Sequence, residues 1–177
     1  SKEQIWSSAT DEEGNVYVGT YPNGKVIKYS PADGKLTDLG QVDSQCGYVR
    51  SMAYYDGYIY AGLGVSGKVY RINATTFEKE DITKNMPELV GKTIENIKFA
   101  YDMAVVGKHL FVRVDDGGNS TLVFYDLENQ SWVNKSYGKQ NNNSVDDYGA
   151  FGFSNQLAVH DNNAYVAHQR QLYTIDL

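Results

Sequence analysis

Residues 16–29, VYVGTYPNGKVIKY, decide the fold: a short alternating run with an aromatic residue at its second position, a glycine-containing turn, and a second alternating run. The same phrase returns in residues 59–72, 110–125 and 164–175. In every copy an alanine of an earlier alternating run precedes the aromatic residue by seven or eight residues. The aromatic residues are Tyr17, Tyr60, Phe111 and Tyr165, spaced 43, 51 and 54 residues apart. Short strands repeated with a period of about 40 to 50 residues are typical of β-propeller blades.

We therefore expect an all-β fold: a β-propeller segment of about four blades, each a four-stranded antiparallel sheet. The blades should cover approximately residues 1–40, 41–83, 92–137 and 149–177, with strands that we term A to D in each copy. The last copy stops at Asp176 and Leu177, just after strand C, and a closed propeller completes its final blade. We expect the chain to form part of a larger propeller of six to eight blades, completed by further sequence or by a second chain; a four-bladed ring with one short blade is the alternative.

Two connections from strand D to the next strand A are long. Residues Asn85–Gly91 read as one short helical turn, with Asn as cap, Pro early and Gly at the end. Residues Gly138–Tyr148 read as a polar loop. We expect both on the face of the propeller that binds ligands.

The composition excludes several classes of protein. The net charge of −6 is spread along 177 residues with no basic run, which argues against nucleic acid or an anionic membrane surface as the main partner. No apolar run approaches the roughly 18 residues of a membrane-spanning helix, so no membrane insertion is expected. The single cysteine, Cys46, cannot form an internal disulfide, and we expect a buried, inert thiol.

The strings at residues 17–35 and 60–72 resemble the "YVGT…G.VY.YDP.TGK" repeats of bacterial propellers in the quinoprotein-like and NHL-like superfamilies. The tryptophan-docking repeat of quinoprotein dehydrogenases, the paired glycines of kelch repeats and the Trp-Asp of WD40 repeats are absent from the sequence. The resemblance implies a secreted or cell-surface bacterial protein, commonly one that handles carbohydrate.

Comparing the copies with each other singles out residues that depart from the repeat. One strand-B position carries small residues suited to close packing between blades, except that the third copy has Arg113; the row reads Gly19, Gly62, Arg113 and Ala167. Arg113 could reach a ligand carboxylate, or it could form a salt bridge between blades with Asp115 or Asp102.

Two adjacent rows in strand A carry polar and aromatic residues. One row is Ser7, Ser51, Asp102 and Gln156, and the row one residue earlier is Trp6, Arg50, Tyr101 and Asn155. Because strands A line the central channel of a propeller, we expect ligand-binding residues at the mouth of that channel. The candidates are Tyr21, Tyr48, Arg50, Tyr101, Asp102 and Arg113. Aromatic faces suit the C–H faces of sugars and charged groups suit hydroxyls or uronate carboxylates; a hydrated, self-paired channel is the alternative.

The remaining candidates have ordinary explanations beside them. His109, His160 and His168 could act as a base in a uronate lyase, or they could be surface residues of strands. Residues Asp11–Asn15 and Asp115–Asn119 faintly resemble calcium loops, but hairpin turns also require Asp, Asn and Gly. We therefore expect no cofactor and keep calcium as the one candidate.

The function expected from the sequence is that of a ligand-binding propeller segment, with carbohydrate as the expected ligand. A catalytic propeller of a polysaccharide lyase or hydrolase and a protein-interaction scaffold remain alternatives. A lyase needs a His or Tyr base beside an Arg, a hydrolase needs two carboxylates, and a scaffold needs a broad exposed apolar patch.

Overall fold

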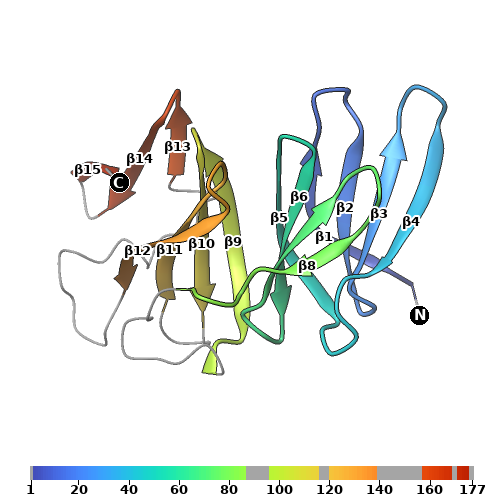
Figure 1. Cartoon of the computed structure of the whole chain (residues 1–177), viewed down its shortest axis with the longest axis horizontal. Coiled ribbons are helices and arrows are strands. Elements are labelled where there is room, and N and C mark those ends of the chain that lie inside the picture. Colours follow the sequence, from blue (N-terminus) through green and yellow to red (C-terminus); the bar gives the residue numbers. More distant parts are fainter. Residues whose placement is uncertain (1, 87–95, 116–119, 139–156, 169–170, 176–177) are drawn as a thin grey trace.

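The computed structural model describes residues 2–86, 96–115, 120–138, 157–168 and 171–175, and this part of the chain contains fifteen β-strands and no α-helix (Figure 1). The strands are β1 (Gln4–Thr10), β2 (Val16–Tyr21), β3 (Lys25–Ser30), β4 (Lys35–Gln41), β5 (Tyr48–Tyr55), β6 (Tyr58–Gly64), β7 (Val69–Asn73), β8 (Lys79–Asp81), β9 (Phe99–Val106), β10 (His109–Asp115), β11 (Ser120–Asp126), β12 (Ser131–Gly138), β13 (Leu157–His160), β14 (Asn163–His168) and β15 (Gln171–Ile175).

The strands form four antiparallel sheets in chain order, which we call the first to fourth sheets: β1–β4, β5–β8, β9–β12 and β13–β15. A single backbone pairing between Gly64 and Phe99 also links the second sheet to the third. These sheets confirm the predicted all-β propeller segment, with a last sheet of three strands in the described part of the chain. No helix among the described residues is long and apolar enough to cross a membrane.

The predicted equivalence of the four aromatic residues is confirmed by the strand register. In each sheet the aromatic residue of the second strand lies opposite the alanine of the first strand. The pairs are Tyr17 with Ala9, Tyr60 with Ala53, Phe111 with Ala104 and Tyr165 with Ala158.

The core lies between successive sheets. Tyr17 and Val26 of the first sheet pack against Ile59 and Ile72 of the second. Tyr60 of the second sheet packs in the same way against the third, and a smaller cluster around Phe111 joins the third sheet to the fourth. Each sheet is therefore stabilised chiefly by the apolar area that it buries against its neighbours.

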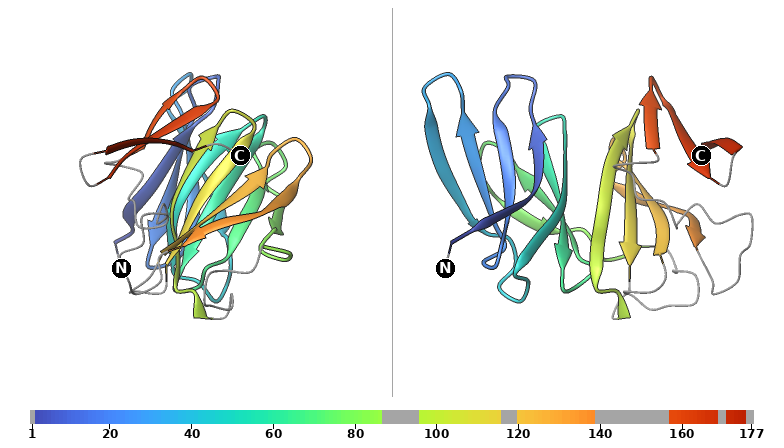
Figure 2. Two further views of the ribbon diagram at one scale, coloured as in Figure 1. Left: turned by 90° about the vertical axis from the view of Figure 1, so that its left-hand side faces the viewer. Right: turned by 180° about the vertical axis from the view of Figure 1, so that it is seen from behind.

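The first strands of the sheets, β1, β5 and β9, run side by side and are called the inner strands here (Figure 2). Equivalent serines connect them: Ser7 Oγ donates to the carbonyl of Val49 (2.8 Å), and Ser51 Oγ donates to the carbonyl of Ala100 (2.7 Å). Opposite these serines lie Gly19 and Gly62. The serine and glycine together let two sheets approach closely.

Neither glycine leaves room for a side chain. A Cβ at Gly19 would overlap Ser7 Oγ and would lie 2.7 Å from Val49 Cβ. A Cβ at Gly62 would overlap Ser51 Oγ and would lie 2.7 Å from the carbonyl oxygen of Ala100. The predicted need for small residues between blades is thus confirmed at these two positions.

A second contact between the first two sheets is electrostatic. Asp43, in the connection from β4 to β5, is nearly buried and accepts hydrogen bonds from Lys68 Nζ (2.6 Å), Tyr70 Oη (2.8 Å) and the Gln45 amide (2.7 Å). Burial alone would raise the pKa of Asp43, but the hydrogen bonds from Lys68, Gln45 and Tyr70 outweigh it and hold the pKa below its ordinary value. The ionised carboxylate therefore fastens the connection to the second sheet.

Two predictions of local structure differ from the structure or fall outside it. The sequence pattern of the second copy predicts its fourth strand over Phe77–Ile82, but β8 is shorter and covers only Lys79–Asp81. The turn before it holds Phe77 at a positive φ of 64°, with Asn73 Oδ1 accepting the amides of Thr75 and Thr76. The predicted helical turn at Asn85–Gly91 and the polar loop at Gly138–Tyr148 lie almost wholly outside the described residues.

Replacing Gly62 with alanine should destabilise the protein by about 1 to 3 kcal/mol, because the added methyl group has to displace the backbone of β9. Urea unfolding measures the effect, with Lys35→Ala on the exposed surface of β4 as a control expected within about 0.5 kcal/mol of the parent. A Gly62→Ala variant as stable as the parent would contradict the close approach of the sheets.

Replacing Asp43 with asparagine should cost about 1 to 2 kcal/mol at pH 7, a range that allows for screening of the partly exposed Lys68. Because folding lowers the pKa of Asp43, its contribution is complete above the unfolded pKa of about 3.9 and disappears as the pH falls through the folded value. Urea unfolding of parent and variant from pH 7 to pH 3 should show their difference shrinking below about pH 4. A penalty that is constant with pH would rule out the ionised carboxylate as its source.

Candidate functional site

Each inner strand has a β-bulge at the same place. The pairing of β1 with β2 passes over Trp6, that of β5 with β6 passes over Arg50, and that of β9 with β10 passes over Tyr101. A bulge leaves one residue outside the ladder and redirects its side chain. Three equivalent irregularities therefore place an indole, a guanidinium and a phenol on neighbouring strands.

The three bulge side chains contact one another. The Arg50 Cζ atom lies 5.3 Å from the ring centroid of Trp6 and 4.0 Å from that of Tyr101. Both distances are within the range of cation–π contacts. Arg50 is half-buried and, within the described part of the chain, forms no ion pair with a carboxylate.

Arg113 and Asp102 occupy the positions that Gly62 and Ser51 hold in the second sheet. Arg113 Nη2 lies 3.9 Å from Asp102 Oδ2, and its Cζ lies 4.3 Å from the centroid of Tyr101. The Arg113 Nε atom is buried without a hydrogen-bond partner among the described residues. The expected salt bridge to Asp102 thus forms, but across two strands of one sheet; the expectation that it would join two blades was wrong, because register makes the two residues direct neighbours.

Aromatic contacts connect Tyr21 and Tyr48 to the same cluster. Their rings stack at 3.9 Å, and Phe99 bridges Tyr48 to Tyr101 through two edge contacts of 6.1 and 6.2 Å. A hydrogen bond with Tyr21 and, to a smaller degree, burial raise the pKa of Tyr48. The structure therefore brings the six candidates from the sequence into one continuous cluster.

A cleft of about 440 Å³ opens beside this cluster along the inner strands. Its walls carry two guanidinium groups, one carboxylate, hydroxyl groups and two thioethers; they are Trp6, Ser7, Ser8, Arg50, Ser51, Met52, Tyr101, Asp102, Met103 and Arg113. The cleft is therefore locally positive in a chain that carries a net charge of −6.

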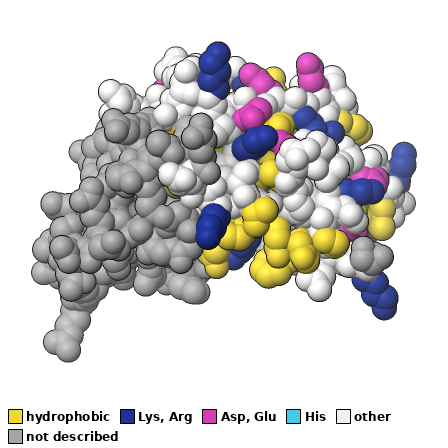
Figure 3. Space-filling model, turned by 90° about the horizontal axis from the view of Figure 1, so that it is seen from below, with side chains coloured by type: hydrophobic (Ala, Val, Ile, Leu, Met, Phe, Trp, Pro, Cys, Tyr) yellow, Lys and Arg dark blue, Asp and Glu magenta, His cyan; other side chains and the backbone are white. Residues whose placement is uncertain are grey.

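The aromatic part of the cluster lies where the inner strands begin, at the bottom of Figure 1, and we call this the lower face. Figure 3 views the lower face and shows hydrophobic side chains gathered in a band with basic side chains beside it. Ile5 is 68% exposed and Trp6 is 42% exposed. The face thus offers both apolar and cationic contacts to a ligand.

Trp6 is the residue that the candidate list from the sequence lacked. It stands in the same row of the repeat as Arg50 and Tyr101, and that row was the signal that could have identified it. The sequence did not show the bulge. Regular alternation assigns Trp6 to the face opposite that of Ser7, whereas a bulge redirects its side chain.

Other candidates lie elsewhere or have structural roles. The Asp11 carboxylate accepts hydrogen bonds from the Glu13 and Asn15 amides and from Tyr17 Oη, so it closes its own turn. No group of three or more His, Cys, Asp or Glu side chains suited to a metal occurs among the described residues. Cys46 is buried beside Ser66, which confirms the expected burial, and burial raises the pKa of its thiol.

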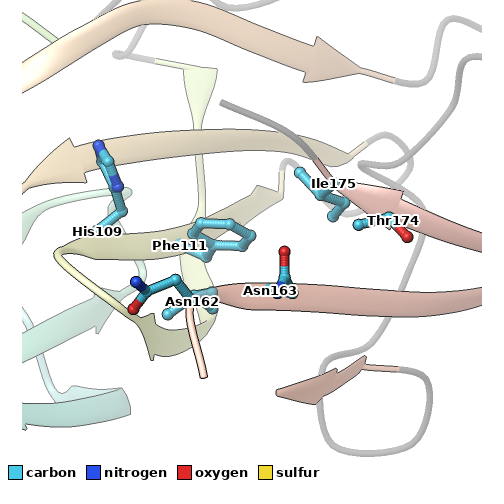
Figure 4. A pocket seen from close by; sticks show the side chains of 7 residues that line it. His109, Phe111, Asn162, Asn163, Thr174 and Ile175 are labelled. Atoms are coloured by element: carbon cyan, nitrogen blue, oxygen red, sulfur yellow. The ribbon is translucent and has the colours of Figure 1, made fainter. Parts of the chain in front are cut away.

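A second cavity, of about 360 Å³, lies between the third and fourth sheets (Figure 4). His109, Phe111, Asn162 and Thr174 are among its walls. His109 begins β10 opposite the end of β9, and exposed His160 ends β13, so both histidines lie at the opposite end of the sheets from the lower face. The side chain of His168 lies outside the described residues.

The fold has clear structural relatives. The chain superposes on a chain of the mitotic checkpoint complex with a TM-score of 0.65 and 12% identity, covering 97% of this chain and 46% of that one. It superposes on YCF48 bound to a D1 peptide with a TM-score of 0.61 and 11% identity, covering 92% and 47%. These relatives have propeller-type folds. The fold is a β-propeller.

A third propeller relative is PorZ, a bacterial surface component of the type-IX secretion system of Porphyromonas gingivalis, with a TM-score of 0.55 and 14% identity over 97% of this chain and 19% of PorZ. This chain therefore spans less than half the length of these relatives. No family model and no curated protein matches it. At such low identity the likeness shows the fold alone.

Proposed function

We propose that this propeller segment binds a carbohydrate that carries a carboxylate group, in the cleft beside the inner strands. The observation that carries the proposal is Arg50, a half-buried guanidinium held by two aromatic rings and paired with no carboxylate of the described residues. An incoming carboxylate supplies what this group lacks.

The surroundings of Arg50 favour a planar anion over a simple counterion. A guanidinium that contacts aromatic rings through its face keeps its N–H groups in the plane free for two parallel hydrogen bonds to a carboxylate. Arg113 lies beside the same Tyr101 ring and meets Asp102 only at 3.9 Å. A uronate carboxylate therefore finds two neighbouring guanidinium groups.

The rest of a sugar suits the other walls of the cleft. Trp6 is 42% exposed and presents an aromatic surface for the C–H face of a pyranose ring. Ser8 is an exposed hydroxyl, and Asp102, which is 24% exposed, can accept hydrogen bonds from sugar hydroxyls. Met52 and Met103 add apolar groups to the lining of the cleft.

Binding is favoured over hydrolysis by the make-up of the cleft. Glycoside hydrolysis usually needs two carboxyl groups facing the scissile bond, and Asp102 is the single carboxylate among the cleft residues that the structure describes. A uronate lyase is the catalytic alternative, because Tyr101 lies beside two guanidinium groups. We further propose that the protein is secreted by a bacterium or attached to its surface, which the likeness to PorZ supports.

A protein-interaction role is the second candidate function. The hydrophobic band on the lower face suits an apolar peptide (Figure 3). Exposed Ile5 and Trp6 lie near the start of β1. One structural relative, YCF48, is seen bound to a peptide. On this alternative the apolar contacts, rather than Arg50, carry the binding energy.

Replacing Arg50 with methionine should weaken binding of oligogalacturonate at least tenfold, because the charge is lost while much of the stem remains. Arg50→Lys should give an intermediate affinity, since an ammonium group makes no bidentate pair. A glycan array with acidic and neutral oligosaccharides, followed by calorimetry on the hits, measures both effects. Lys108→Met, in the exposed turn between β9 and β10, is the matched control and should bind as the parent does.

Equal binding of acidic and neutral oligosaccharides would contradict the role of Arg50. No glycan binding, together with binding of apolar peptides that Arg50→Met leaves intact, would establish the protein-interaction role instead. Unsaturated uronate products on incubation with a bound glycan would show a lyase, and Tyr101→Phe should then abolish product formation without abolishing binding.

A further inference from the structure

Two cavities lie between the second and third sheets, and among the described residues they share no lining side chain with the cleft. One, of about 290 Å³, has Tyr55 and Tyr58 among its walls. The other, of about 330 Å³, lies between β8 and β12 and includes Trp132. Gln130 lines both cavities, so they adjoin, and we call them together the rim site.

Gln130 stands in a turn that repeats an earlier one. The turn from β7 to β8 begins at Asn73, and the turn from β11 to β12 begins at Asp126. In each turn the Oδ1 atom of that first residue accepts the amides two and three residues later. The residue four positions after it has a positive φ in both turns, 64° at Phe77 and 52° at Gln130. Gln130 is therefore the counterpart of Phe77.

The two counterparts differ in what they contribute to the junction beside them. Phe77 is half-buried and packs against the apolar cluster that joins the first sheet to the second. Gln130 is exposed and lines the rim site. An exposed amide in place of an apolar ring thus leaves space open between the second and third sheets.

Aromatic side chains stand at both ends of the rim site. Tyr55 and Tyr58 are direct cross-strand neighbours in β5 and β6, and both are half-buried. At the other end the half-buried Trp132 meets the Tyr125 ring edge-on at 5.1 Å. Trp132 Nε1 donates to the carbonyl of Ile82 (2.7 Å), which holds the indole in place. Because its one donor is used, the indole offers a ligand its apolar surface.

The charges of the rim site differ from those of the cleft. Its described lining residues carry one ammonium group and four carboxylates, those of Lys84, Asp56, Glu80, Asp81 and Glu128. Two of the carboxylates already have cations, since Arg71 Nη2 lies 2.5 Å from Glu80 and Lys108 Nζ lies 2.8 Å from Glu128. An anionic ligand is therefore disfavoured, and a cationic ligand meets carboxylates that are in part neutralised.

We propose that the rim site binds a neutral oligosaccharide. The faces of Tyr55, Tyr58 and Trp132 suit the C–H faces of pyranose rings. The Gln130 amide both donates and accepts hydrogen bonds, and a carboxylate such as that of Asp56 accepts them from hydroxyl groups. Two adjoining cavities with aromatic rings at both ends favour a chain of sugars over a single one. The rim site is a second site, and its ligand does not rest on the acidic ligand proposed for the cleft.

Tryptophan fluorescence tests this site alone. The sequence holds two tryptophans, Trp6 and Trp132, so a Trp6→Phe chain reports on Trp132 only. At least one of a panel of neutral tetrasaccharides of glucose, mannose, galactose and xylose should change the emission of Trp132 and shield it from acrylamide. Tetragalacturonate should have neither effect, and in excess it should not displace the neutral sugar.

Two variants of the Trp6→Phe chain locate the binding. Gln130→Phe should weaken it at least tenfold, because the equivalent turn of the second sheet carries a phenyl ring on the same backbone. Tyr55→Leu keeps an apolar side chain and removes one aromatic face, so it should weaken binding several-fold. Thr75→Phe adds the same ring to an exposed position of the β7–β8 turn and is the matched control, which should bind as the Trp6→Phe chain does. Circular dichroism spectra that match this chain would show that the variants are folded.

Three results would overturn the proposal. The first is a panel in which no neutral tetrasaccharide affects Trp132. The second is displacement of the neutral sugar by tetragalacturonate, or undiminished binding in folded Gln130→Phe and Tyr55→Leu, since either would place the sugar elsewhere. The third is shielding of Trp132 by oligolysine but by no sugar, which would assign the rim site to a cationic segment of a protein.

Discussion

The close approach of successive sheets is the constraint on which the structure depends. At the first two junctions a serine of the inner strand donates to the backbone of the next inner strand, and a glycine beside it leaves the space for that contact. The aromatic residues Tyr17 and Tyr60 then fill the wider part of each junction. Apolar burial supplies most of the stabilisation, whereas the serine–glycine pair fixes how the sheets are positioned.

The third sheet departs from this arrangement, and the candidate site lies where it departs. Asp102 and Arg113 stand in place of the serine and glycine, and an ionised carboxylate cannot donate to a backbone carbonyl as a serine does. The Arg113 side chain is much larger than the glycine at the equivalent position, and its guanidinium lies beside the Tyr101 ring. The replacement of the serine–glycine pair in the third sheet thus places two charged side chains in the wall of the cleft.

Much of the fold could be predicted from the sequence because the repeat carries it. Alternation, turn residues and the recurring aromatic gave strands close to those observed, and a hairpin restricts register to few choices. The start of β8 was less predictable, since the turn depends on hydrogen bonds of the Asn73 side chain rather than on hydrophobic pattern. Arg113 and Asp102 were recognisable as departures from the repeat, and Arg50 and Tyr101 stood in the neighbouring row of strand A. The bulges that bring Trp6 to Arg50 were not recognisable, because an extra residue in one strand leaves no mark in the alternation that period-two reasoning can detect.

The bulges give the three inner strands one unpaired residue each, in the same place, although the residue differs from strand to strand. Indole, guanidinium and phenol occupy these places in the present chain. Because the residue at a bulge has no partner in the ladder, exchanging its side chain should leave the pairing of its strand intact. The side chains beside the cleft can therefore differ from strand to strand while the strand pairing that holds the sheets stays the same.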